Sequence, residues 1–231
     1  MSPNEERFTA EIEGRELNFS NLSKVMYPET GFTKGELIDY YLRIGPAMLP
    51  HIARRPITSK RFPNGVASQG FIEKNVPKHA PDWIRTAVLA RRMKGKDTNQ
   101  YALIDDLPGL VFFANLAAIE FHTPMWRLPP AGEEGAEGDV EGDEDAVNAR
   151  DATPDILVFD LDPGAPAAIQ ECCQVAIVLR DRLAGIGIEL WPKTSGSKGM
   201  QLYGCIAERG WQGMEVNEFA HLAAEAVETD M

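Results

Sequence analysis

Residues 130–153 constrain the fold of this chain more than any other stretch. They are rich in Gly, Ala, Asp and Glu and contain scarcely any large apolar side chain. A segment of this composition cannot bury enough apolar surface to offset the entropy lost on ordering, so we expect a disordered acidic loop. This segment separates the basic first half of the chain from the strand that carries Asp160 and Asp162, and it is the best boundary between modules. We therefore predict an N-terminal module over residues 1–129 and a second module over residues 154–231.

Charge is distributed unevenly along the chain, whose formal net charge is −12. Residues 131–151 hold nine acids against one arginine, whereas residues 51–96 hold eleven Lys or Arg against two acids. A strongly acidic protein is a poor partner for nucleic acid, but a locally basic face is the electrostatic mark of phosphate binding. A solvated basic surface without a ligand is the alternative that charge alone leaves open.

Several protein classes are disfavoured by the sequence. No apolar run approaches the length of a membrane span, and residues 1–7 lack the character of a signal peptide. The three cysteines have no metal-ligand spacing, and their odd number suits free thiols in a reducing compartment. We therefore expect a cytoplasmic protein with no membrane partner.

The first module shows a mixture of helix and strand patterns. Thr33 with Glu36 forms a capping box ahead of a helix predicted over residues 34–49, although Pro46 and Pro50 obscure its end. Strands are predicted at 56–62, at 71–75, near 86–92 and near 100–104. Asp105 or Asp106 is expected to cap a buried helix over residues 107–122, which would carry Glu120 and His122 at its end.

The second module opens with a buried strand that ends in two acids. Ile156–Phe159 is followed by Asp160, Leu161 and Asp162, and Pro163-Gly164 then stops the strand. Residues i and i+2 of a strand share a face, so two carboxylates would project together and would favour a divalent cation such as Mg²⁺ or Mn²⁺ between them. The alternative is that both acids are turn and helix-cap residues at the end of a strand.

A polar turn follows later in the second module. After a helix predicted over 165–183 and a strand at 188–191, the chain reads Pro192-Lys193-Thr194-Ser195-Gly196-Ser197-Lys198-Gly199, with a strand at 200–203 and a helix over 214–231 after it. Backbone N–H groups, hydroxyls and a lysine in one turn suit phosphate oxygens. The spacing is not that of a Walker A loop, and a plain hairpin turn is the alternative.

Taken together, these stretches resemble the polymerase domain of bacterial ATP-dependent DNA ligase D, in the archaeo-eukaryotic primase superfamily. The resemblance runs from about residue 20 to residue 205. It is carried by Ser23-Lys24-Val25-Met26-Tyr27-Pro28, by the Lys34–Tyr41 helix, by Arg55-Pro56 and Lys60 to Gly65, by Phe71 to Lys74, by Ala118 to His122 with Trp126, by Phe159 to Gly164, and by Thr194 to Gly199.

The resemblance implies an α+β primase-polymerase core, in which an N-terminal α/β module meets a sheet module built like an RNA-recognition motif. It implies template-dependent addition of nucleotides, often ribonucleotides, at DNA breaks or gaps in non-homologous end joining. The site residues follow from the matching positions. Asp160 and Asp162 would hold two catalytic Mn²⁺ or Mg²⁺ ions; Ser195, Lys198, His122, Lys60 and Arg61 would bind the nucleotide; Lys24, Lys34 and Phe71 would bind DNA with a 5′-phosphate.

Two departures from the family pattern affect these expectations. Phe71 is followed by Ile72 where the family often has a second aromatic residue, so one stacking surface is replaced. The family's third metal-binding Asp lies on a later strand, and no segment after Lys198 matches it; Asp230 follows a helix pattern. We therefore expect a C-terminally truncated domain with an incomplete sheet module.

Three functions compete at this point. The first is a repair primase-polymerase that uses NTP or dNTP, acts beside the nucleoid, and works with the end-joining protein Ku and a ligase domain. The second is a non-catalytic module that binds 5′-phosphorylated DNA ends, because the third acid is missing. The third is a metal-dependent phosphohydrolase that uses the same pair of acids.

Overall fold

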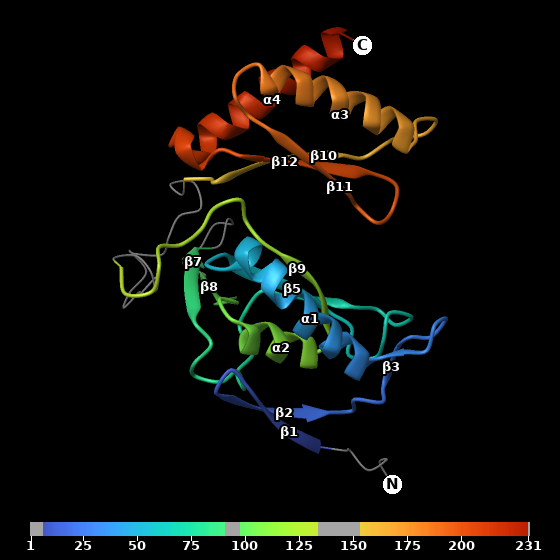
Figure 1. The fold of residues 1–231 in the computed structure, drawn as a ribbon, viewed down its shortest axis with the longest axis vertical. Coiled ribbons are helices and arrows are strands. Elements are labelled where there is room, and N and C mark those ends of the chain that lie inside the picture. The colour runs from blue at the N-terminus through green and yellow to red at the C-terminus, as the bar shows by residue number, and fades with distance from the viewer. Residues whose placement is uncertain (1–6, 91–97, 134–152, 231) are drawn as a thin grey trace. The chain divides into compact units, whose positions relative to one another are not determined.

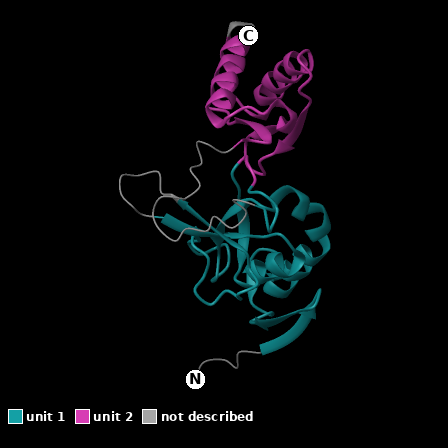
Figure 2. Cartoon of the chain, turned by 90° about the vertical axis from the view of Figure 1, so that its left-hand side faces the viewer, with its two compact units in different colours: residues 1–124, 128–147 teal, residues 125–127, 148–231 magenta. Residues whose placement is uncertain are grey.

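The structure is a computed structural model that describes residues 7–90, 98–133 and 153–230. The chain forms two compact units, one of residues 1–124 and 128–147 and the other of residues 125–127 and 148–231 (Figure 2). The acidic segment expected as a disordered loop, residues 130–153, lies mainly outside the described residues, so that expectation stays a prediction. None of the described helices has the length and apolar character needed to span a membrane.

Two antiparallel hairpins open the first unit. Strand β1 (Arg7–Ile12) pairs with β2 (Arg15–Ser20), and β3 (Val25–Tyr27) pairs with the short β4 (Phe32–Thr33). Helix α1 (Lys34–Ile52) follows directly, and the predicted capping box between Thr33 and Glu36 is confirmed. The helix continues past Pro46 and Pro50 and ends three residues later than predicted.

Strand β5 (Pro56–Arg61) is the centre of a five-stranded sheet in the first unit (Figure 1). It pairs antiparallel with β6 (Phe71–Glu73), with β8 (Thr98–Leu103) and with β9 (Ala118–His122), and β7 (Thr86–Ala90) pairs with β8. The four strands predicted between residues 56 and 104 are therefore all confirmed. Because β5 contacts three strands, side chains from separate parts of the sequence meet along it.

The helix predicted over residues 107–122 is wrong in its second half. Asp106 caps helix α2 (Leu107–Asn115) by accepting a hydrogen bond from the Gly109 N–H, as predicted for Asp105 or Asp106. The chain then leaves the helix at Ala117, whose φ is +60°. Residues 118–122 form β9, because pairing with β5 satisfies their backbone groups. Glu120 and His122 consequently lie on a strand.

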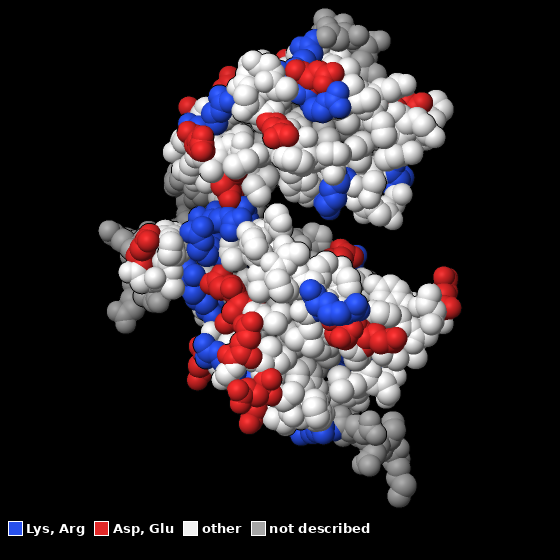
Figure 3. All heavy atoms as spheres, in the orientation of Figure 1, with Lys and Arg blue, Asp and Glu red and all other residues white. Residues whose placement is uncertain are grey.

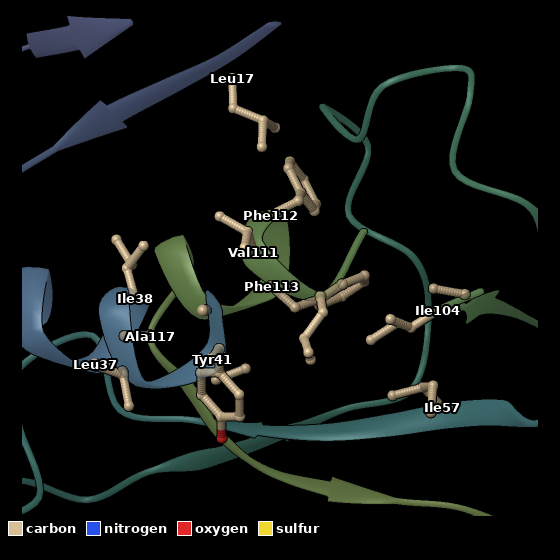
Figure 4. Close-up of a cluster of buried hydrophobic side chains, with 14 of the residues drawn as sticks. Leu17, Leu37, Ile38, Tyr41, Ile57, Ile104, Val111, Phe112, Phe113 and Ala117 are labelled. Carbon is tan, nitrogen blue, oxygen red and sulfur yellow. The ribbon is translucent and has the colours of Figure 1, made fainter. Parts of the chain in front are cut away.

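The core of the first unit forms where α1 and α2 pack together against the hairpins and the sheet. Leu37, Ile38 and Tyr41 of α1 meet Val111 and Phe113 of α2 in this cluster (Figure 4). The apolar stripe that predicted α1 is therefore its buried face. Packing of this face also explains why the helix tolerates two internal prolines.

The second unit has the element order β-α-β-β-α. Strand β10 (Ile156–Leu161) is followed by α3 (Ile169–Ala184), β11 (Leu190–Thr194), β12 (Met200–Cys205), a 3₁₀ turn η1 (Ala207–Arg209) and α4 (Gly213–Asp230). The sheet order is β10-β12-β11, with both outer strands antiparallel to β12. Helices α3 and α4 lie on the same side of this sheet (Figure 1). Buried side chains on that side, such as Leu157, Phe159 and Leu202, form a separate core.

Candidate functional site

The two acids of the second unit lie at the end of β10. Asp160 is on the strand, directly opposite Gln201 of β12, and its side chain is exposed. Strand β10 ends at Leu161, so Asp162 lies one residue beyond it. A Cβ atom on Gly199 would come within 2.7 Å of Asp162 Oδ1 and 2.4 Å of the Leu161 carbonyl oxygen. The absence of a side chain at residue 199 therefore lets the Ser195–Gly199 turn pack against Asp162.

Hydrogen bonds within the turn fix its shape. The Ser195 N–H and Oγ both donate to the Gly199 carbonyl, at 3.0 and 2.9 Å, and the Gly199 N–H lies 3.2 Å from the Ser195 Oγ. Lys198 Nζ donates to the Pro163 carbonyl at 3.4 Å, so the ammonium group lies beside the chain that follows Asp162. The turn and the start of α3 line a cavity of about 720 Å³. The turn that carries Ser195 and Lys198 is thus brought beside Asp162 and Pro163.

The two acids are candidate ligands for a divalent cation. In the part of the chain that the structure describes, neither Asp160 nor Asp162 forms an ion pair with a basic side chain. Within that part, no cluster of three or more His, Cys, Asp or Glu side chains could hold a metal by itself. Mg²⁺ is commonly held by one or two carboxylates together with substrate phosphates. Two carboxylates near a turn that carries two serines and a lysine fit a site of this kind, in which substrate phosphates would complete the coordination.

Three cations meet in the first unit, where β3, α1 and β5 lie close together. Lys34 is the first residue of α1, is only 6% exposed, and donates from Nζ to the Ser20 carbonyl at 2.7 Å. Lys24 Nζ donates to the Pro63 carbonyl. Burial, and then the charges of Lys24 and Arg61, lower the pKa of Lys34 to about 8. The three side chains form a cluster of like charges that an anion would stabilise, and we call this cluster of Lys24, Lys34 and Arg61 the cation pocket.

Arg61 is held in this pocket by several partners. Its Nε donates to the Leu116 carbonyl at 2.9 Å, and its Nη1 pairs with Glu73 at 2.7 Å. Its guanidinium also lies 5.2 Å from the centre of the Phe71 ring. Phe71 is 44% exposed and directly opposite Arg61 on β6. The structure therefore groups Arg61 with Phe71 and the two lysines, that is, with the residues predicted to bind DNA.

Lys60 belongs to a different group because neighbouring strand residues point to opposite faces. It lies opposite Glu120 of β9, and its Nζ pairs with Glu120 Oε1 at 2.7 Å. The other carboxylate oxygen of Glu120 lies 3.1 Å from His122 Nε2. The hydrogen bond from Lys60 is the main cause that lowers the pKa of Glu120. Glu120 thus links two side chains that were predicted to bind nucleotide, and sequence reasoning gave it no role.

Some of the positive charge of residues 51–96 is buried or paired within the first unit and is therefore not available on its surface. Arg55 is fully buried and donates to the His51 and Pro124 carbonyls, and Arg85 pairs with Asp105 at 2.8 Å. On the face of the molecule in Figure 3, Lys and Arg side chains lie among Asp and Glu side chains. Residues 91–97, which hold four more of the basic residues, lie outside the described residues. The basic character of residues 51–96 is therefore local; Arg61 belongs to the cation pocket, whose two lysines, Lys24 and Lys34, lie outside this range.

Comparison with known proteins gives one consistent family. Residues 33–231 match the LigD primase-polymerase domain. The multifunctional non-homologous end joining protein LigD of Mycobacterium bovis is 42% identical over 190 residues, covering 81% of this chain and 23% of that protein. The corresponding protein of Mycolicibacterium smegmatis is 38% identical over 192 residues, and it covers 83% of this chain and 22% of its own length. The chain spans about a quarter of the length of the curated relatives it matches.

A solved structure extends the comparison to the fold. The polymerase domain from Mycobacterium tuberculosis ligase D in complex with DNA matches with a TM-score of 0.79 and 37% identity, covering 93% of this chain and 69% of that chain. The predicted α+β fold class and the resemblance inferred from separate motifs are therefore confirmed.

Proposed function

The chain belongs to the LigD primase-polymerase family, and from that premise we propose that it transfers nucleotides to DNA ends or gaps during non-homologous end joining. One observation carries the proposal: Gly199 lets the Ser195–Gly199 turn pack against Asp162. Ligands for a divalent cation and donors for phosphate oxygens thus lie side by side. That combination is what transfer of a nucleotide from a triphosphate requires.

The proposed reaction joins a primer 3′-hydroxyl to the α-phosphorus of an NTP or dNTP. The new P–O bond forms as the bond to the bridging oxygen breaks, pyrophosphate leaves, and the hydroxyl proton passes to solvent. Divalent cations, Mn²⁺ or Mg²⁺ in a two-metal site, would activate the hydroxyl and neutralise the triphosphate. Asp160 and Asp162 would hold them. Lys198 and the hydroxyl of Ser195 would bind the phosphate oxygens of the nucleotide.

The first unit supplies the proposed contacts to DNA. The cation pocket would bind the 5′-phosphate of a downstream strand, since a dianion offsets the mutual repulsion of Lys24, Lys34 and Arg61. Phe71 would stack on an unpaired template base. Lys60 and His122 are proposed to contact the nucleotide, with Glu120 fixing their positions. Ku, a ligase domain and a location beside the nucleoid belong to the same proposal.

A second candidate function is supported by the contrast between the two groups. Lys24, Lys34 and Arg61 all lie among the described residues, whereas within those residues no third acid joins Asp160 and Asp162 in a metal-binding cluster. A module that binds 5′-phosphorylated ends without catalysis would need the pocket alone. It would bind DNA without a metal, and its affinity would depend strongly on salt.

Primer extension on a gapped duplex with a 5′-phosphate, in Mn²⁺ and ribonucleotides, tests the first function. We expect template-directed extension by the unmodified chain and none by the double variant D160N/D162N. Extension that survives in the double variant would contradict the assignment of the acids. Tight, metal-independent binding to the same duplex without extension would favour the second function. Hydrolysis of nucleotides without primer or template would point to a phosphohydrolase instead.

A further inference from the structure

The sheet of the second unit has one face that neither α3 nor α4 covers. Directly paired residues share a face, so Asp160 of β10, Gln201 of β12 and Lys193 of β11 form one row across the three strands. The apolar residues that alternate with them lie on the opposite face, in the core with α3 and α4. The proposed metal ligand Asp160 therefore belongs to a polar row that continues across the whole sheet.

The next row of the same face carries two aromatic residues. Trp191 of β11 lies directly opposite Tyr203 of β12 and is 61% exposed. Within the described residues, no other aromatic ring packs against Trp191. Tyr203 donates from its hydroxyl to Gln201 Oε1 at 2.9 Å, and Lys193 Nζ lies 5.8 Å from the Tyr203 ring. An exposed indole beside a cation and an amide suits a nucleobase, which has a flat apolar face and polar edges.

The position of Trp191 fits the length of a nucleotide. From Trp191, strand β11 continues to Thr194 and leads directly into the Ser195–Gly199 turn, so Trp191 and the turn are separated by about 13 Å of extended chain. Asp160 lies two strand spacings from Lys193, or about 10 Å. A nucleoside triphosphate carries phosphates at one end and the base at the other. With its phosphates at the turn, it would pass over the Asp160 row and bring its base to Trp191.

We propose that Trp191 is a base-stacking residue for the incoming nucleotide, and that the polar row of Asp160, Gln201 and Lys193 lies beneath the sugar and the α-phosphate. The proposal deepens the proposed function and rests on it, because the phosphate end must bind at the turn. It adds a residue that the motif comparison did not assign. Stacking accepts every base, so Trp191 contributes affinity without selecting a sequence.

The test compares two ligands that share phosphates but differ in the base. Binding of ATP and of inorganic tripolyphosphate to the 231-residue chain is measured by calorimetry in Mn²⁺, for the unmodified chain, W191A and W191F. We expect ATP to bind about tenfold more tightly than tripolyphosphate, within the range found for stacking on aromatic side chains. W191A should remove this difference and leave tripolyphosphate binding unchanged, whereas W191F should keep most of it.

A matched control is F8A, because Phe8 is also an exposed aromatic residue, at 56%, but lies on β1 of the first unit. It should bind both ligands as the unmodified chain does. Circular dichroism checks that W191A is folded, and W191F tests stacking if it is not.

Equal ATP affinity of W191A and the unmodified chain overturns the role of Trp191 and leaves the proposed function standing. Loss of DNA binding alone in W191A also overturns it, since the face would then contact another partner. If the unmodified chain binds neither ligand, the proposed function and this inference both fail.

Discussion

The cation pocket of the first unit and the acid pair of the second unit are built in opposite ways. Lys34 is buried, and the ammonium groups of both lysines are held by main-chain carbonyls. Asp160 and Asp162 are exposed, and within the described residues neither is paired with a basic side chain. Both places hold like charges: three cations meet in the first unit, and the two acids are separated by one residue in the sequence. The pocket side chains are held by hydrogen bonds within the first unit, whereas Asp160 lies opposite Gln201 and Asp162 lies beside Gly199.

This contrast has a consequence for the order of events on binding. The three cations of the partly buried pocket repel one another, so an anion that enters the pocket is stabilised at once. An exposed pair of carboxylates is well solvated and gains from a cation mainly when phosphate oxygens complete the coordination. We therefore expect the first unit to bind phosphorylated DNA without metal. The second unit should bind divalent cations well only together with a nucleotide.

The largest effect should come from neutralising the acids. D160N and D162N should each lower nucleotide addition at least about a hundredfold, because several kcal/mol of charge stabilisation is lost. Stability should change by less than about 0.5 kcal/mol, since both side chains are exposed. Primer extension and thermal unfolding measure the two quantities. D181N is a matched control, because Asp181 is an exposed acid on α3. An equal loss of activity in D181N would show that the effect is not specific to Asp160 and Asp162.

The next effect concerns the contact between the turn and the acids. In G199A the new Cβ would lie 2.4 Å from the Leu161 carbonyl and 2.7 Å from Asp162 Oδ1. We expect a loss of about 2 kcal/mol in the free energy of unfolding, typical of overpacking, together with weaker nucleotide binding. Urea denaturation and nucleotide titration measure these changes. G164A is the control, since a Cβ there would meet no atom within 4 Å; normal nucleotide binding by G199A would contradict the assignment.

A smaller effect is expected in the cation pocket. K34Q should lower affinity for a 5′-phosphorylated end about tenfold and should barely change affinity for the same end without phosphate, because one charge-assisted contact is lost. Fluorescence anisotropy with the two DNA ends measures the difference. K78Q removes an exposed lysine of the same unit and should weaken binding to both ends equally. If K34Q lowers the affinity for both DNA ends by the same factor, the pocket does not recognise the phosphate.

Proton binding by Lys34 offers a finer test of the same pocket. Its pKa is about 8, below the ordinary value, so the free protein loses this proton as the pH rises through 8. A bound phosphate favours the charged form of Lys34, so affinity for the phosphorylated end should be level between about pH 7 and 8, where the phosphate is a dianion, and should fall above pH 8. Between about pH 8 and 10.5 the unfolded chain binds more protons at this residue, and stability should therefore rise with pH there. K34Q should abolish the pH dependence of DNA affinity and the contribution of this residue to the pH dependence of stability. If affinity still falls above pH 8 in K34Q, a group other than Lys34 causes the fall.

The smallest effect should come from Glu120. E120Q removes the ion pair with Lys60 and the contact with His122, yet these side chains are at least one-third exposed. An exposed ion pair contributes about 0.2–1 kcal/mol, so the loss of stability should stay within that range. The KM for nucleotide should rise a few-fold while kcat changes little. H122Q in the E120Q background should then add less than H122Q alone, and full additivity would show that Glu120 does not position His122.

Much of the local structure follows from the sequence. The capping box at Thr33 and Glu36, the acids after the β10 strand and the polar turn at 195–199 each combine a short-range pattern with a physical cause that acts within a few residues. The helix predicted over residues 107–122 was wrong in its second half because that prediction also relied on a short-range pattern. Ala118–His122 is apolar enough to continue a helix, and only its pairing with β5, distant in sequence, makes it a strand.

Grouping of the site residues depended on the tertiary structure. Lys60 and Arg61 are adjacent in the sequence and were assigned one role, but strand alternation and the partners on β6 and β9 direct them to different groups. Glu120 gained a role only when β9 placed it opposite Lys60. The charge of residues 51–96 likewise could not show that Arg55 and Arg85 are used inside the first unit.

The sequence by itself therefore predicted a division into modules and a chemistry for each motif, and it determined the family. These depend on composition and on residue order over short distances. The tertiary structure decided which charges are buried, which are paired, and that Trp191 shares a face with Asp160. Such properties depend on contacts between strands that lie tens of residues apart, and hydrogen-bond register between strands, which sets those contacts, is not encoded in any single segment.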